Sequence, residues 1–232
     1  MLVLSDGVVI LRDFIESDIE DYVRWETVET EWKLWDAPWE HVGQADGQRA
    51  AALREDVAWM HAHACEVALL RDNDPRRRFE ICVVDGGDPS PFHGEGIADS
   101  RRLLVSGVDA PTALHIGGVS TYRIDDDFSI AENGRHLVLG IDINSAVSRG
   151  RGYGLRALRL FIEYLFRGGA EEIYCQTWSG NERMIRLASK LGFEECCRKP
   201  GLREVRGQHY DGVTFVLKSA FASGDCASTR GD

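Results

Sequence analysis

A glycine- and arginine-rich loop between a strand-like run and a helix-like run constrains the fold of this chain more than any other feature. Residues 136–143 (His-Leu-Val-Leu-Gly-Ile-Asp-Ile) have the composition of a strand. From Leu155 to Phe166 the apolar residues recur at helical spacing, and Gly168-Gly169 ends the pattern. The loop between them comprises Arg149, Gly150, Arg151, Gly152, Tyr153 and Gly154. We therefore expect a strand–loop–helix unit in which the glycines allow positive φ and close approach of a ligand to the backbone.

The positive charge of this loop is unusual for the start of a helix. A helix N-terminus usually carries Asp or Glu, because its free N–H groups and its dipole are positive. Here residues 149–167 hold five arginines and one acid, Glu163, in a chain with a net charge of −11. The pattern predicts an anion site, most simply for a pyrophosphate. The alternative is a glycine-rich turn with solvated arginines.

Two other nucleotide-binding motifs fit this loop less well. The dinucleotide fingerprint needs G-x-G-x-x-G directly after a strand, whereas this loop has G-x-G-x-G several residues later. A P-loop is excluded, because the loop lacks Gly-Lys-Ser/Thr.

The rest of the chain predicts a mixed α/β (α+β) domain built around one central sheet. Ser17 and Glu20 resemble a capping box that starts a helix running to about Val28. We expect further helices at 48–70 and 184–191, and strands at 8–11, 79–84, 113–122, 173–178, 194–206 and 213–217. Residues 1–218 then form a single domain with a Gly/Pro-rich insertion at about 85–111, and residues 219–232 form a flexible tail.

Composition narrows the class of protein and its partners. No run approaches the ~18 apolar residues of a membrane span, and the start lacks a signal-peptide pattern. The six cysteines show no zinc-type spacing, and two potential ligands, His61 and Cys65, do not make a metal site, so we expect no metal. A chain of this size does not need disulfides, so free cysteines fit a cytoplasmic location. The net charge of −11 argues against nucleic acid and favours cationic partners.

Three segments together resemble a known family. Arg149-x-x-Gly152-x-Gly154 resembles the acetyl-CoA signature of the GNAT superfamily of N-acetyltransferases. Residues 178–181 (Trp-Ser-Gly-Asn), a following helix and Gly192-Phe193 are similar to the family's next block. Residues 210–213 (Tyr-Asp-Gly-Val) resemble the last hairpin of the branch that acetylates ribosomal-protein N-termini.

The resemblance implies the GNAT acyl-CoA N-acyltransferase fold, whose strands four and five splay apart in a mixed sheet flanked by helices. The donor implied is acetyl-CoA, which an amine attacks directly. The backbone of Ile141, Asp142 and Ile143 would pair with the pantetheine arm, and Asn181 would anchor that arm near the thioester. Amides of residues 149–154 would hold the pyrophosphate.

The resemblance leaves the catalytic groups open. Many relatives carry a glutamate on strand four, but residues 137–140 here read Leu-Val-Leu-Gly, which leaves His136 and Asp142 as candidate bases. Many also carry a tyrosine seven residues after the asparagine, where this chain has Ala188. For the acceptor, Trp35, Asp36, Trp39 and Glu40 fall in the family's variable substrate segment and could contact a cation, or the tryptophans could simply pack on the core.

Three hypotheses follow. The first is an N-acetyltransferase acting on a small-molecule amine or a peptide N-terminus. The second is an acyl-CoA-binding module with little or no catalysis, and the third is an unrelated nucleotide-binding protein. The insertion at 85–111 is a candidate lid over the acceptor, and a homodimer is left open.

Overall fold

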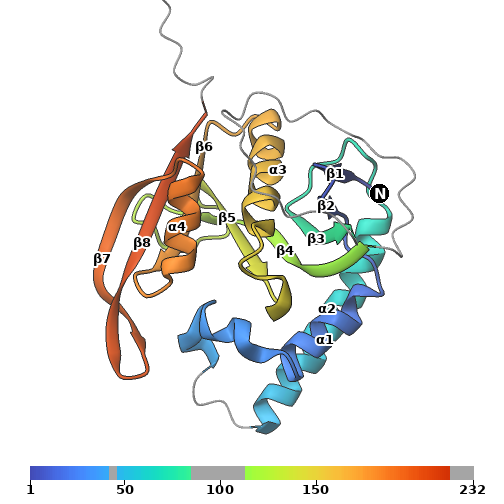
Figure 1. Ribbon diagram of the computed structural model, residues 1–232, viewed down its shortest axis with the longest axis horizontal. Helices are drawn as coiled ribbons and strands as arrows, with labels where there is room; N and C mark the ends of the chain where they lie inside the picture. Colours follow the sequence, from blue (N-terminus) through green and yellow to red (C-terminus); the bar gives the residue numbers. More distant parts are fainter. Residues whose placement is uncertain (42–45, 85–112, 220–232) are drawn as a thin grey trace, which may run out of the picture.

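The computed structural model describes residues 1–41, 46–84 and 113–219, and these form one mixed sheet with helices on both faces (Figure 1). The strands are β1 (Val3–Ser5), β2 (Val9–Arg12), β3 (Arg78–Val84), β4 (Ala113–Ile124), β5 (His136–Ile143), β6 (Glu172–Trp178), β7 (Glu194–Val205) and β8 (Gln208–Lys218). The helices are α1 (Asp18–Thr27), α2 (Asp46–Ala68), α3 (Tyr153–Arg167) and α4 (Glu182–Lys190), and short 3-10 turns are η1 (Thr30–Leu34), η2 (Pro38–His41) and η5 (Ala146–Ser148).

The eight strands lie in the order β1-β2-β3-β4-β5-β6-β8-β7, and only β5 and β6 are parallel. A parallel pair needs a long crossover, which α3 supplies. β5 pairs with β4 over its whole length, but it pairs with β6 only at Val138↔Tyr174 and Leu139↔Cys175. Beyond Leu139 the two strands separate, so the sheet is split at its centre. The splay expected from the family resemblance is therefore present.

The main core lies between the sheet and α3. Leu158 and Phe161 of α3 are fully buried, and Phe161 meets Phe79 of β3 edge to face. Each such side chain contributes about 1.5–3 kcal/mol by burial. α3 and α4 lie over the same face of the sheet (Figure 1). Burial of the apolar side of α3 against the sheet stabilises residues 153–167 as a helix.

The opposite face of the sheet is polar where α1 covers it. Successive side chains of a strand point to opposite faces, so Glu80 faces away from Phe79 and Ile81. Its carboxylate accepts a hydrogen bond of 2.6 Å from Tyr22 of α1. Glu80 is fully buried, so this hydrogen bond ties α1 to the sheet in addition to the packing of the buried Trp25 ring of α1 on His115 of β4.

The expected elements of the described residues are present, with two corrections. β1 was not expected, because three residues carry too little pattern. α1 has the expected position, but Ser17 makes no side-chain capping bond, so the expected capping box is wrong. Asp18 instead accepts from the Ile15 N–H at 2.9 Å and pairs with Arg12. The insertion at 85–111 and the tail from 220 onward lie outside the described residues.

No helix within the described ranges combines the length and the apolar character that crossing a membrane requires.

Candidate functional site

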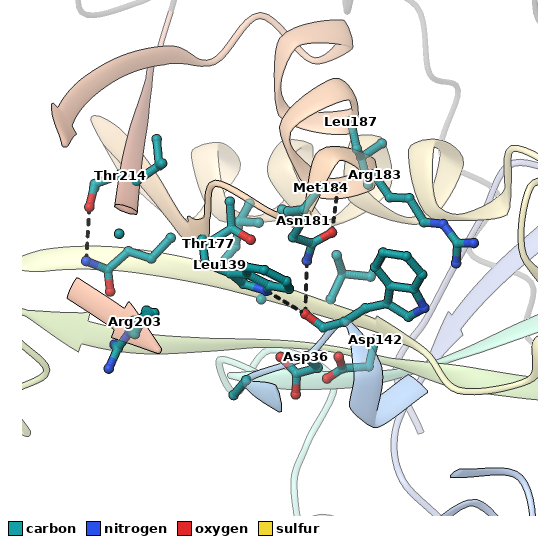
Figure 2. A pocket seen from close by; sticks show the side chains of 18 of the residues that line it. Asp36, Leu139, Asp142, Thr177, Asn181, Arg183, Met184, Leu187, Arg203 and Thr214 are labelled. Atoms are coloured by element: carbon teal, nitrogen blue, oxygen red, sulfur yellow. Dashed lines mark hydrogen bonds between the residues drawn. The ribbon is translucent and has the colours of Figure 1, made fainter. Parts of the chain in front are cut away.

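A cavity of about 790 Å³ opens where β5 and β6 part (Figure 2). Its walls come from both strands, from β4, from the starts of α3 and α4, from the β7–β8 hairpin, and from the η1–η2 segment, residues 30–41. Of the residues that the sequence indicates, it is lined by Trp35, Asp36, Trp39, Glu40, Ile141, Asp142, Ile143, Arg149, Gly154 and Asn181. Gly150, Arg151, Gly152, Tyr153 and His136 do not line it.

The cavity connects the two faces of the sheet through the split. Gly118 pairs with both Glu80 and Asp142, so Asp142 lies on the α1 face. Ile141 and Ile143 point to the α3 face and approach Gly154, where an added Cβ would lie 3.6 Å from Ile141 Cδ1. A long molecule entering beside α3 could therefore reach the carboxylate on the other face.

The N-terminus of α3 opens beside this split. Gly152 is its N-cap residue with φ of 80°, and Gly150 has φ of 74°. Glycine adopts such left-handed conformations without steric cost. Gly152 has no side chain to cap the helix, and no acid lies in the first turn. The first-turn N–H groups are thus left for an external acceptor, as a helix N-terminus that binds phosphate requires.

Several arginines of the loop region are neutralised within the protein. Arg149 donates to the carbonyls of Ile143 at 2.8 Å and Asn144 at 2.9 Å, and it pairs with Glu31 at 3.1 Å. Arg156 pairs with Asp6 at 2.8 Å. Glu31 and Asp6 therefore reduce the excess of positive charge at the loop. The local sequence does not show this, because both acids are distant from the loop along the chain.

Asp36 and Asp142 lie side by side in the cavity (Figure 2). Burial, reinforced by the neighbouring charge of Asp36, raises the pKa of Asp142 to about 7. Burial and then Glu40 also raise the pKa of Asp36. Two close carboxyl groups disfavour simultaneous ionisation and attract a cation. This centre can therefore take up a proton near neutral pH or hold an ammonium group.

The η1–η2 segment is fastened over the split by its backbone. The carbonyl of Trp35 accepts hydrogen bonds from Trp178 Nε1 at 3.0 Å and Asn181 Nδ2 at 3.3 Å (Figure 2). The Asn181 Oδ1 atom accepts from the Met184 N–H at 3.1 Å and so caps α4. Asn181 is the residue that the resemblance assigns to the pantetheine arm, and here its amide joins α4 to the η1–η2 segment.

Two of the three tryptophans in that segment, Trp35 and Trp39, have an arginine over the ring. Arg183 lies over the Trp35 ring at 4.2 Å, and Arg203 lies over the Trp39 ring at 4.3 Å. Each arginine covers one side of its ring, and contact of Trp35 and Trp39 with an external cation stays a prediction. Asp36 and Glu40 also line the cavity. Sequence reasoning missed both arginines, because their partners are distant in the chain.

His136 lies far from the other candidate groups. Its Nε2 is 2.9 Å from Asp126 Oδ1, and it begins β5 while Asp142 lies near the end. Six residues of strand separate the two by about 20 Å. Of the two alternative candidate bases, Asp142 lines the cavity and His136 does not.

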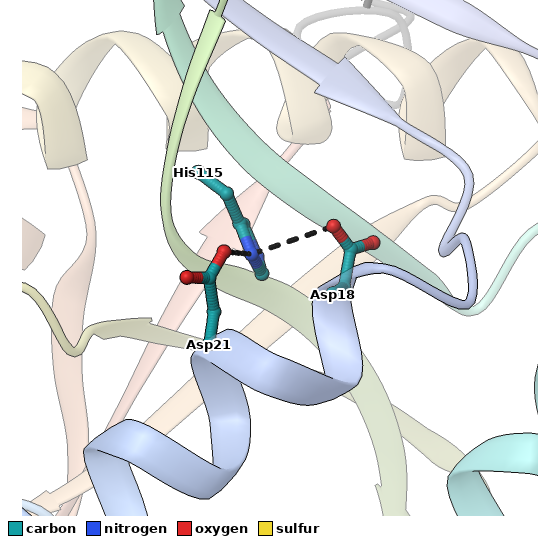
Figure 3. Close-up of side chains that lie close together, drawn as sticks. All are labelled: Asp18, Asp21 and His115. Carbon is teal, nitrogen blue, oxygen red and sulfur yellow. Dashed lines mark hydrogen bonds and ion pairs between the residues drawn. The ribbon is translucent and has the colours of Figure 1, made fainter. Parts of the chain in front are cut away.

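A second cluster of charged groups lies under α1 (Figure 3). His115 Nδ1 is 2.9 Å from Asp21 Oδ2, and His115 Nε2 is 3.0 Å from Glu80 Oε2. Burial alone would lower the pKa of His115, but the bonds to Asp21 and Glu80 raise it to about 9. The Asp18, Asp21 and His115 group could geometrically hold a metal ion. In this structure both imidazole nitrogens form ion pairs with carboxylates, of Asp21 and Glu80.

Known proteins share this fold. Residues 9–194 match the sequence model of the acetyltransferase (GNAT) domain. Among solved structures, ribosomal-protein-S5-alanine acetyltransferase from Vibrio fischeri is 15% identical with a TM-score of 0.60, over 95% of this chain and 98% of that chain. A GNAT-family acetyltransferase from Bacillus anthracis is 9% identical with a TM-score of 0.57, over 94% and 98% of the two chains.

The Salmonella typhimurium protein yncA, solved with its cofactor acetyl-CoA, is 15% identical with a TM-score of 0.53, over 97% and 99% of the two chains. At these identities the likeness shows the fold. None of the curated proteins matches the chain in sequence.

Proposed function

This chain belongs to the GNAT family of acetyltransferases, and from that premise we propose that it transfers the acetyl group of acetyl-CoA to a primary amine with Asp142 as the general base. The acceptor is a small-molecule amine or a peptide N-terminus. The observation that carries the proposal is the carboxyl pair of Asp36 and Asp142, which lies in the split of the sheet opposite the open end of α3.

The features beside α3 fit acetyl-CoA. The β5 edge from Gly140 to Ile143 has no partner strand on the β6 side, so its backbone groups can bond to an extended arm. The first-turn amides of α3 suit a pyrophosphate. Bound acetyl-CoA supplies the acetyl group as a reactive thioester.

The residues on the α1 face suit the attacking amine. An alkylammonium has a pKa near ~10.4 and must lose a proton before it can attack. Asp142 has a pKa of about 7, close to working pH, where a general base is most effective. Asp36 holds the ammonium beside Asp142 and then stabilises the protonated base. The amine would add to the thioester carbon to form the N–C bond, and a backbone N–H of the free β5 edge would stabilise the oxyanion that develops. Collapse of the oxyanion would then break the C–S bond.

The leaving group needs no tyrosine in this scheme. Ala188, which stands where many relatives carry the acid, is fully buried in the core and cannot donate a proton. The thiolate is a good leaving group and takes its proton from solvent or from Asp142.

The test of the donor site uses two glycines at opposite ends of α3. Gly152 and Gly169 both have left-handed φ, of 80° and 94°, and an added Cβ meets no atom within 4 Å at either. Each Gly→Ala change costs about 1–2 kcal/mol of backbone strain. Only Gly152→Ala is expected to weaken acetyl-CoA binding, by about 10-fold or more for a few lost amide bonds, as measured by calorimetry. Equal affinities in both variants would contradict the assignment of this loop.

The test of turnover follows release of the CoA thiol with a panel of primary amines. Sustained release by the unmodified protein, and its loss in Asp142→Asn, are the expected results. Release that Asp142→Asn leaves unchanged would remove Asp142 from the role of base.

A further inference from the structure

We propose that the acceptor amine also carries an anionic group, and that Arg203 binds this group while Asp36 and Asp142 hold the ammonium. The inference rests on the proposed function and names the class of acceptor: a small zwitterionic amine, such as a free amino acid or an aminoalkylphosphonate. The cavity is lined by the carboxyl groups of Asp36 and Asp142 at one position and by the guanidinium group of Arg203 at another.

The first observation is the way Arg203 reaches the cavity. Lys199 of β7 pairs with Gly212, and Arg203 pairs with Tyr210, so three residues of β7 stand opposite one residue of β8. Gly201 in this bulge has φ of 62°, and its N–H donates to Asp211 Oδ1 at 3.0 Å. A bulge redirects the side chains that follow it. Arg203 consequently lines the cavity, although it comes from a strand at the edge of the sheet.

The second observation is the state of its guanidinium group. Arg203 is partly buried, and its Cζ atom lies 4.3 Å from the centre of the Trp39 ring. No carboxylate of the residues 1–41, 46–84 and 113–219 forms a salt bridge with it, unlike its neighbour Arg198, which pairs with Glu195 and Asp211. A planar guanidinium held on an aromatic ring presents its N–H groups edge-on, in the geometry that binds carboxylate or phosphonate oxygens in pairs.

The third observation is the position of Arg203 relative to the carboxyl pair. Arg203, Asp36 and Asp142 line the same cavity, and Figure 2 shows Arg203 to one side of the two carboxyl groups. Tyr122 of β4 also lines this cavity. The Tyr122 hydroxyl donates to Gln176 Oε1 at 3.2 Å, so this polar wall is fixed. Lys199 also lines this end of the cavity and donates to the Asp127 carbonyl at 2.5 Å.

These positions distinguish a zwitterion from a protein N-terminus. In a peptide the group beside the terminal amine is a neutral amide, which leaves Arg203 without an anion. In a free amino acid the carboxylate satisfies Arg203, and its charge offsets the cost of removing the guanidinium from water. Exchange of that carboxylate for a carboxamide removes only the anion, so acid and amide form a matched pair of probes.

The experiment uses the full-length protein with acetyl-CoA and measures CoA-thiol release with amino acids and with their carboxamides. We expect the acids to exceed their amides in kcat/KM by about 10-fold or more, the value of one charge-assisted pair. Arg203→Gln is expected to lower kcat/KM for the acids by roughly 10- to 100-fold and to leave the amides within about 2-fold. Arg206→Gln, at an exposed position of the same hairpin outside the cavity, is the control and should change neither.

The outcomes separate this inference from the proposed function. Equal rates for acids and amides, or an acid preference that survives Arg203→Gln, would overturn the inference and leave the acetyl transfer standing. Aminoalkylphosphonates in the same assay show whether carboxylate or phosphonate is the preferred anion. If no amine releases CoA, calorimetry in the presence of CoA measures the binding of each amino acid and of its carboxamide. Binding of the acids that is lost in Arg203→Gln supports the inference. Equal affinities for acid and amide, or no binding of either, refute it.

Discussion

Asp142→Asn should make the protein more stable and less active at the same time. The side chain keeps its size and loses its charge, and the charge is what the folded state disfavours. Burial, with the field of Asp36, raises the pKa of Asp142 from 3.8 to about 7. In the unfolded chain both influences disappear, so the carboxyl group there ionises near its ordinary value.

The sign of the pH dependence follows from this difference. Between pH 3.8 and about 7 the folded state retains a proton that the unfolded state has released. Stability therefore falls as pH rises through this interval and is level above it. A shift of about three units corresponds to roughly 4 kcal/mol, an upper bound because the group is only partly buried. We expect Asp142→Asn to gain about 2 kcal/mol at pH 8.5, equal to a rise in Tm of about 4–8 °C for a chain of this length.

The assay is urea unfolding of both proteins from pH 5.5 to 8.5. The gain should grow with pH up to about 7 and then stay constant, while CoA-thiol release falls by roughly 100-fold or more, the usual worth of a general base. Asp56→Asn, at an exposed position on α2, controls for the loss of one negative charge and should show neither effect. A gain that does not depend on pH, or a loss of stability at pH 8.5, would refute the reasoning.

Two further predictions concern the supports of the site. Gly180→Ala would place a Cβ 1.9 Å from the Trp178 ring and so break the hydrogen bond from Trp178 Nε1 to the Trp35 carbonyl. The variant should lose about 1–3 kcal/mol of unfolding free energy and bind acetyl-CoA more weakly in calorimetry. Gly47→Ala on α2, where an added Cβ meets nothing within 4 Å, is the matched control, and similar losses in both would contradict the prediction. The raised pKa of His115, about 9, predicts stability that is complete below pH 6.5 and lost as pH rises through 9. Unfolding free energies of His115→Gln should lack that decline, and an unchanged decline would exclude His115 as its source.

The local sequence was enough to predict the secondary structure that builds the site. β5 has the bounds expected from its composition, and the helix after the loop follows from apolar residues at helical spacing. Glycine at 152 indicated a left-handed turn at the start of α3, which its φ of 80° confirms. These features depend on residues within a few positions of one another, so periodicity and glycine content carry them.

The tertiary structure alone decided which charges meet. Asp36 and Asp142 are more than a hundred residues apart in the chain, and only the split of the sheet makes them a pair with raised pKa values. The loop arginines indicated an anion site by their number, yet Arg149 is paired with Glu31, which no local pattern foretells. Arg203 reaches the cavity through a bulge on an edge strand. Electrostatic partners are set by distance in space, and a single sequence records only distance along the chain.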